Sequence, residues 1–139
     1  MTLVDTHAHI YVTEFDPDLA ETLRRAEKEG VSKIILPAID SRIHEAMLVV
    51  ENENPTTCFS MMGVHPCSVN DNYREELKIA RDYFEKRPFK AVGEIGLDFY
   101  WDKTFTEQQY AAFHEQIGWA LHFDIPIAIH SRNATDECI

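Results

Sequence analysis

The stretch AVGEIGLD, residues 91–98, places one carboxylate, Glu94, inside an otherwise apolar segment. Residues 90–96 have the short apolar pattern of a buried strand. A buried carboxylate costs free energy unless it is paired or holds a metal ion. Gly93 and Gly96 leave space around the acid, which suggests that something approaches it closely. The segment therefore predicts a buried strand that carries a functional acid.

Strands and helices are expected to alternate along the rest of the chain. Four further apolar segments are predicted as strands: residues 3–9, 31–37, 57–64 and 126–130. A helical pattern follows each of the first three and the strand at 90–96. The last residues, 131–139, look like the loop and first turn of a fifth helix. Strict alternation of this kind indicates parallel strands joined by right-handed crossovers.

Local signals predict where the helices begin and end. The Asp-Pro pair at residues 16–17 is expected to start the first helix, and Gly30 is expected to end it. Ser41 is expected to cap the second helix. Thr106 and Gln109 form a capping-box pattern at the start of the fourth. That helix carries one apolar face: Tyr110, Phe113, Ile117, Ala120 and Leu121.

Two architectures fit this order, an open doubly wound sheet and part of a (β/α)8 barrel. The first would carry a glycine-rich turn after its first strand, and the sequence has none there. Polar residues instead follow the strand ends, where a barrel gathers its active face: His7 and His9, His65, Glu94 and His130. We therefore predict an α/β fold with the first five βα units of a TIM-type barrel. Residues 1–139 would form one domain that stops before the roughly 250 residues of a closed barrel.

Charge and apolar runs exclude some classes of protein. Lys and Arg total 13 and Asp and Glu total 24, a net charge of −11, so the surface as a whole repels polyphosphates. Binding of a nucleic acid would need a local feature such as a bound metal ion. The longest apolar runs, such as residues 34–39, are far shorter than the ~20 residues of a membrane-spanning helix. No membrane segment is expected.

The cysteines indicate a reducing compartment. Cys58, Cys67 and Cys138 are odd in number and form no CxxC pair, so a disulfide framework is not expected. We expect reduced thiols in a cytoplasmic protein. The first residues also lack the basic and apolar regions of a signal peptide.

Histidines and carboxylates supply candidate metal ligands. His7 and His9 are two residues apart, so they share one face of a strand and could bind one ion. Glu94 is a candidate ligand, with a buried ion pair as the alternative, and His130 ends the last predicted strand. Asp98 stays open between a role in the site and hydrogen bonding in a loop. Three other histidines lie on predicted helices and are expected at the surface or partly buried, without a site role: His44, His114 and His122.

Other residues near the strand ends could contact a substrate. Arg132 could bind phosphate oxygens in a bidentate way, through two parallel N–H groups, or form a surface ion pair. His65 could contact substrate or assist proton transfer, or stabilise a turn. Tyr100 lies in an aromatic run, residues 99–101, on which bases could stack or which could plug the loop. Lys103 is a candidate phosphate contact or a plain surface charge.

Four motifs together resemble the TatD family of metal-dependent deoxyribonucleases, within the amidohydrolase superfamily. They follow one another in order across the whole chain: DTHAH at 5–9, GVHP at 63–66, GEIGLD at 93–98 and IHSR at 129–132. The resemblance implies a (β/α)8 barrel with two divalent ions, Mg, Mn or Zn, that hydrolyses DNA phosphodiester bonds. It implies that His7 and His9 hold the first ion, Glu94 bridges both and is catalytic, and His130 holds the second. His65 and Arg132 match positions near the substrate.

Two features depart from the family pattern. Cys67 stands where the family often has a second histidine. The resemblance also implies a further histidine and an aspartate beyond Ile139, so the 139 residues alone are expected to be weakly active or inactive. Two alternatives stay open: a related hydrolase of an amide, lactone or phosphotriester, and a non-catalytic half-barrel. A half-barrel would have two open sheet edges and could self-associate through them.

Overall fold

The computed structural model describes residues 2–139 as alternating strands and helices. The strands are β1 (Leu3–Asp5), β2 (Val31–Leu36), β3 (Cys58–Ser60), β4 (Val92–Asp98) and β5 (Ile127–Arg132). The helices are α1 (Leu19–Lys28), α2 (His44–Glu53), α3 (Tyr73–Lys86), α4 (Thr106–Phe123) and α5 (Thr135–Cys138). Two short 3-10 helices, η1 (Thr13–Phe15) and η2 (Pro66–Ser68), lie in the loops that follow β1 and β3.

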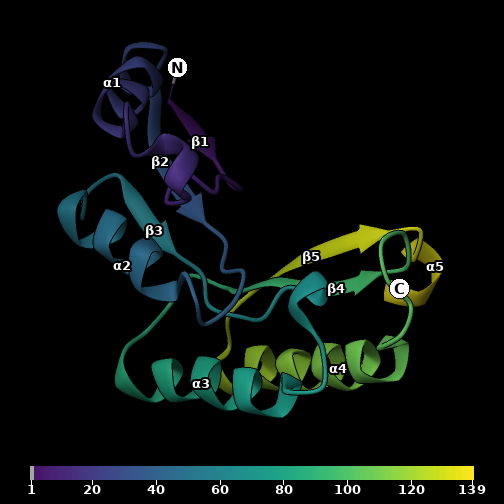
Figure 1. Cartoon of the computed structure of the whole chain (residues 1–139). Helices are drawn as coiled ribbons and strands as arrows, with labels where there is room; N and C mark the ends of the chain where they lie inside the picture. The colour runs from purple at the N-terminus through teal and green to yellow at the C-terminus, as the bar shows by residue number, and fades with distance from the viewer. Residues whose placement is uncertain (1) are drawn as a thin grey trace.

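The strands run parallel in chain order. β2 pairs with β1 on one side and with β3 on the other, and β4 pairs with β5. A parallel bridge between Met62 and Val92 joins the two groups. Figure 1 shows β1–β3 with α1 and α2 as one arm, while β4 and β5 lie over α3 and α4. The predicted parallel βα units are therefore confirmed.

Two strands end earlier than the sequence suggested, which moves three histidines into loops. β1 ends at Asp5 because its carboxylate accepts a hydrogen bond from the backbone N–H of His7, 3.0 Å away. His7 and His9 therefore lie in the loop after β1, not within a strand at 3–9. β3 ends at Ser60, and His65 caps η2 instead of following a strand directly. At β1 a local side-chain bond competes with the ladder. After β3 the backbone instead turns toward β4, where the N–H of Met62 donates to the Ala91 carbonyl at 3.2 Å.

Helix starts also differ from the local signals, and for α2 and α4 the expected capping side chains bind elsewhere. α1 begins at Leu19, not at residues 16–17, although Gly30 ends it with the expected positive φ of 90°. The hydroxyl of Ser41 donates to Glu76 at 2.7 Å, so it does not cap α2. The capping box at Thr106 is absent, because the amide of Gln109 binds the backbone of β4.

The core lies between the sheet and the helices. Every residue of β4 is buried, whereas all three residues of β1 are exposed. The buried face of α4 includes Gln109 and Gln116, and Leu121 was wrongly placed on it, since its side chain is 79% exposed. His44 was also wrongly placed near the surface. It is 1% exposed, and a hydrogen bond of its Nε2 to the Gly63 carbonyl, 3.1 Å away, compensates for the burial of the ring. His114 and His122 are exposed as expected.

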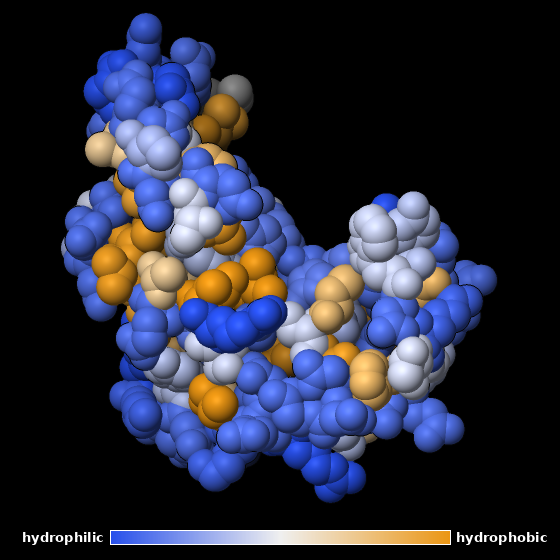
Figure 2. Space-filling model, viewed as in Figure 1, coloured by the Kyte–Doolittle hydropathy of each residue, from blue (hydrophilic) through white to orange (hydrophobic). Residues whose placement is uncertain are grey.

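Surface chemistry differs between the two groups of strands. In Figure 2, hydrophobic residues show mainly on the arm that holds β1–β3, while the side of α3 and α4 is mostly hydrophilic. Among residues 2–139, no helix is long and apolar enough to cross a membrane. Cys58, Cys67 and Cys138 are all free thiols, as expected.

Candidate metal centre

Glu94 is the centre of a group of four histidines. It lies in β4, is 7% exposed, and directs its two carboxylate oxygens to different neighbours. Oε2 lies 3.0 Å from Nε2 of His7 and 3.3 Å from Nε2 of His9. Oε1 lies 3.1 Å from Nδ1 of His130 and 3.7 Å from Nε2 of His65. The structure thus brings together residues separated by more than 120 positions in the sequence, including all four predicted metal ligands.

The orientation of His9 is set by a buried tyrosine. The hydroxyl of Tyr11 donates a hydrogen bond to the carbonyl of Pro37, and a carbonyl can only accept. The Tyr11 oxygen must therefore accept from Nδ1–H of His9, which is 2.9 Å away. In the neutral imidazole, Nε2 then carries a lone pair, and that lone pair faces Glu94.

This arrangement fits a metal ion. Nε2 of His9 and Oε2 of Glu94 are both acceptors and lie 3.3 Å apart. Either a proton or a metal cation must lie between them, because two lone pairs repel each other. Together with the imidazole of His7, they form a group of nitrogen and oxygen ligands that suits zinc, manganese or iron.

The surrounding imidazoles keep Glu94 ionised. Burial by itself raises the pKa of Glu94, but the four neighbouring imidazoles lower it to about 2. Burial lowers the pKa of His65 to about 4, against the attraction of Glu94. At pH 7 the carboxylate is charged and His65 is neutral.

Cys67 belongs to a second group of possible ligands, with His65 and His130. Its thiol, however, donates to Oδ2 of Asp98 at 3.3 Å. Burial and this hydrogen bond raise the pKa of the Cys67 thiol to about 12. Because the thiolate is the form that binds metals, this geometry favours the group around Glu94 over the group with Cys67.

The aromatic loop after β4 lies beside Arg132. The guanidinium of Arg132 stacks 3.9 Å from the ring centre of Tyr100 and 5.0 Å from that of Trp101. These rings are 52% and 68% exposed, so the alternative of a hydrophobic plug holds only for the half-buried Phe99. The ammonium of Lys103 lies 5.9 Å from the Phe99 ring. Stacking leaves the edge of the guanidinium available for a ligand.

Sequence reasoning assigned no role to Tyr11 and left Asp98 open. Tyr11 lies two residues after His9, and Asp98 lies four residues after Glu94, so each falls on the same every-second-residue alternation as a candidate ligand. Residues at this spacing share a face of an extended segment, so the alternation was a usable signal. Gln109 binds the backbone of Asp98 at 2.8 and 3.1 Å, and no sequence signal pointed to this contact.

Comparison with known proteins gives one consistent result. Residues 4–139 match the model of the family described as TatD related DNase. The chain is 34% identical over 138 residues to the metal-dependent hydrolase YabD of Bacillus subtilis, covering 99% of this chain and 53% of YabD. It is 28% identical to the 3'-5' ssDNA/RNA exonuclease TatD of Erwinia tasmaniensis, covering 99% of this chain and 53% of that protein.

A solved structure agrees with these relatives. The crystal structure of YjjV, a TatD homolog from Escherichia coli K12, matches with a TM-score of 0.88 and 33% identity. The match covers 98% of this chain and 53% of YjjV. The chain therefore spans about half the length of the curated relatives it matches.

Proposed function

The chain belongs to the family of TatD related DNases, and from this membership we propose that it carries the metal-binding part of a hydrolase of DNA phosphodiester bonds. The observation that supports this most directly is Glu94, a buried and ionised carboxylate with imidazole nitrogens facing both of its oxygens. A relative is named as an exonuclease of single-stranded DNA and RNA.

Two divalent ions, Mg, Mn or Zn, are proposed as cofactors. His7, His9 and Oε2 of Glu94 would hold the first, and His130 with Oε1 of Glu94 would hold the second. When bound, such ions activate water and neutralise charge on the leaving oxygen. They would also attract phosphate to one place on a chain whose net charge is −11.

The chain's own residues would bind and orient the nucleic acid. Nδ1 of His65 accepts from the backbone N–H of Cys67 at 3.1 Å, so its Nε2 carries the hydrogen when the ring is neutral. That N–H can donate to a phosphate oxygen. Arg132, held against Tyr100, would bind a second phosphate oxygen, and Tyr100 would stack on a base. Lys103 is proposed as an outer phosphate contact.

The test is release of nucleotides from single-stranded DNA with added magnesium or manganese. We expect activity in a protein that carries this sequence at the full length of its relatives. The 139 residues alone should be much weaker, since the family pattern implies two further ligands. Arg132→Lys should raise KM several-fold and leave metal affinity unchanged, because lysine loses the bidentate edge. Efficient cleavage of a lactone or amide, with no action on DNA, would contradict the proposal and favour the related hydrolase.

Self-association is proposed for the 139-residue chain. Among the described residues, β1 and β5 each pair on one side only, and Val4 and Ile129 are about half exposed on them. Open edges with apolar side chains favour pairing with a second copy. Sedimentation should detect dimers or larger species at micromolar concentration. A compact monomer that melts cooperatively would contradict this. The cytoplasmic location expected from the thiols stays a prediction.

A further inference from the structure

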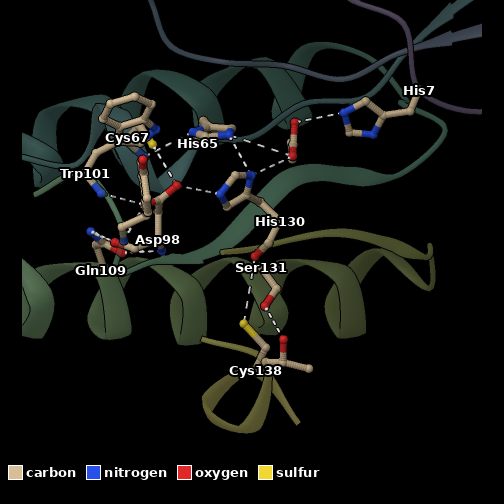
Figure 3. A network of polar contacts seen from close by, with 12 residues as sticks. His7, His65, Cys67, Asp98, Trp101, Gln109, His130, Ser131 and Cys138 are labelled. Atoms are coloured by element: carbon tan, nitrogen blue, oxygen red, sulfur yellow. Dashed lines mark hydrogen bonds and ion pairs between the residues drawn. The ribbon is translucent and has the colours of Figure 1, made fainter. Parts of the chain in front are cut away.

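Asp98 is a buried carboxylate beside the candidate metal centre that the proposed ligand set does not use. It ends β4, four residues after Glu94, and is 1% exposed. Its Oδ2 lies 2.8 Å from Nε2 of His130, while Nδ1 of the same ring lies 3.1 Å from Oε1 of Glu94. In Figure 3 the ring of His130 directs one nitrogen to Asp98 and the other toward His65. The imidazole therefore lies between two carboxylates.

The carboxylate of Asp98 is held in place by groups that can only donate. Its Oδ1 accepts from the backbone N–H of Tyr100 at 3.0 Å and of Trp101 at 3.2 Å. The side chain of Gln109 binds both the N–H and the carbonyl of Asp98, which fixes the backbone at this point. With Oδ1 occupied by two amides, Oδ2 is the oxygen that faces His130.

These contacts determine which nitrogen of His130 carries its hydrogen. A neutral imidazole donates through one nitrogen and accepts through the other. Both nitrogens face a carboxylate oxygen, Nε2 at 2.8 Å from Asp98 and Nδ1 at 3.1 Å from Glu94. The shorter contact to Asp98 assigns the hydrogen to Nε2 and leaves the lone pair on Nδ1. The contact with His65 supports the same assignment. Nε2–H of His65, whose Nδ1 is occupied by the Cys67 amide, lies 3.1 Å from Nδ1 of His130 and can only donate to it.

We propose that Asp98 is a positioning residue that holds His130 as the Nε2–H tautomer and so presents Nδ1 to the metal position beside Glu94. The proposal rests on the proposed function, because it takes His130 as a metal ligand. Asp98 does not bind that ion itself, since the ring of His130 lies between it and Glu94. A carboxylate behind a ligating histidine fixes the ring and makes its free nitrogen a better ligand.

Asp98→Asn is the sharpest variant, because it keeps the shape and reverses the hydrogen bond. The two backbone amides at Tyr100 and Trp101 require an acceptor and will hold the asparagine oxygen. The NH2 group then faces His130, and it can only donate. Nε2 must accept, so the hydrogen moves to Nδ1 and blocks the lone pair. Asp102→Asn is the matched control, since Asp102 is an exposed acid in the same loop that accepts from the Thr104 amide at 2.8 Å.

The tautomer can be measured without any metal. In the 139-residue chain labelled with 15N-histidine, at pH 9 and so above the usual histidine pKa of about 6.5, long-range 1H–15N spectra distinguish the two ring nitrogens. We expect Nε2–H on His130 in the wild type and in Asp102→Asn, and Nδ1–H in Asp98→Asn. His44, bonded to the Gly63 carbonyl, reports whether the fold is kept. Nδ1–H in the wild type would overturn the proposal without any variant, and so would an unchanged tautomer in a folded Asp98→Asn.

Zinc affinity gives the second measurement, by competition with a chelator. Asp98→Asn should bind Zn2+ about 10- to 100-fold more weakly than the wild type, and Asp102→Asn should bind equally well. Equal affinity in Asp98→Asn would overturn the proposal. A wild-type chain that binds no Zn2+ would contradict the proposed metal site instead, and the tautomer would still decide whether Asp98 positions His130.

Discussion

The two oxygens of Glu94 face two halves of the site that are built differently. Oε2 faces His7 and His9, whose side chains are 43% and 29% exposed. Oε1 faces His65 and His130, whose side chains are 14% and 19% exposed. The first half depends on a loop that follows a short exposed strand, and the second lies against the buried centre of the sheet. Candidate ligands of one type therefore differ in how firmly the fold holds their side chains.

The difference follows from the positions of the strands. β4 contributes seven buried residues, and backbone amides around its end hold Asp98 behind His130. β1 contributes three exposed residues, and one hydroxyl, that of Tyr11, orients His9. The half around Oε1 should therefore tolerate substitution less well than the half around Oε2.

Glu94→Gln should have the largest effect, because it affects both halves at once. A neutral amide would bridge the two proposed cations poorly and offers one acceptor in place of two. We expect Zn2+ affinity to fall by more than the roughly 10- to 100-fold that loss of a supporting partner costs, and hydrolysis of DNA by a full-length protein to stop. Competition with a chelator measures the affinity. Glu107→Gln, an exposed acid at the start of α4, is the control and should bind normally.

Alanine substitution of one histidine from each half should lower the free energy of unfolding by different amounts. His130→Ala removes the partner of the buried Asp98 carboxylate, so the free energy of unfolding should fall by about 1–3 kcal/mol. His7→Ala removes a half-exposed side chain and should change it by less than about 0.5 kcal/mol. Urea unfolding of the metal-free chains measures both. Equal losses would contradict the contrast between the halves.

Tyr11→Phe should weaken metal binding at the half around Oε2 and leave the half around Oε1 unchanged. It removes the acceptor for Nδ1 of His9 and leaves the Pro37 carbonyl without its donor. We expect Zn2+ affinity to fall by about 10-fold, and the free energy of unfolding to fall by about 1 kcal/mol. The spectrum of His130 should not change. Tyr73→Phe is the matched control, and a shifted His130 tautomer in Tyr11→Phe would show that the halves are coupled.

The smallest effect is expected at a histidine outside both halves. Burial lowers the pKa of His44 below 6.5, against hydrogen bonding to Gly63 and the attraction of Asp40, Glu76 and Glu45. Below pH 6.5 the unfolded chain binds a proton that the folded chain does not, so the free energy of unfolding falls as the pH falls. The slope from one such group is at most about 1.4 kcal/mol per pH unit.

His44→Gln should reduce that slope, because glutamine can still donate to the Gly63 carbonyl but does not titrate. Urea unfolding at pH 7.5 and pH 5.5 measures the difference. His122→Gln, at an exposed position of α4, is the control and should keep the wild-type slope. An unchanged slope in His44→Gln would mean that another group causes the loss of stability at low pH.

The order and direction of the strands could be predicted because hydrophobic patterns are local and parallel crossovers have few alternatives. The strand ends could not be predicted. A single hydrogen bond from His7 to Asp5 ends β1, and the pattern of apolar residues does not contain it. The same holds for Ser41 and Gln109, whose side chains suit a helix cap but bind distant partners.

The sequence by itself determined which chemical groups the site contains and that they gather at one edge of a parallel sheet. His7, His9, Glu94 and His130 were identifiable because their motifs follow strands whose carboxyl ends must meet. Only the tertiary structure decided which nitrogen of each imidazole faces the carboxylate. That choice depends on where partners distant in sequence place their hydrogens, and the pattern of residue types does not record it.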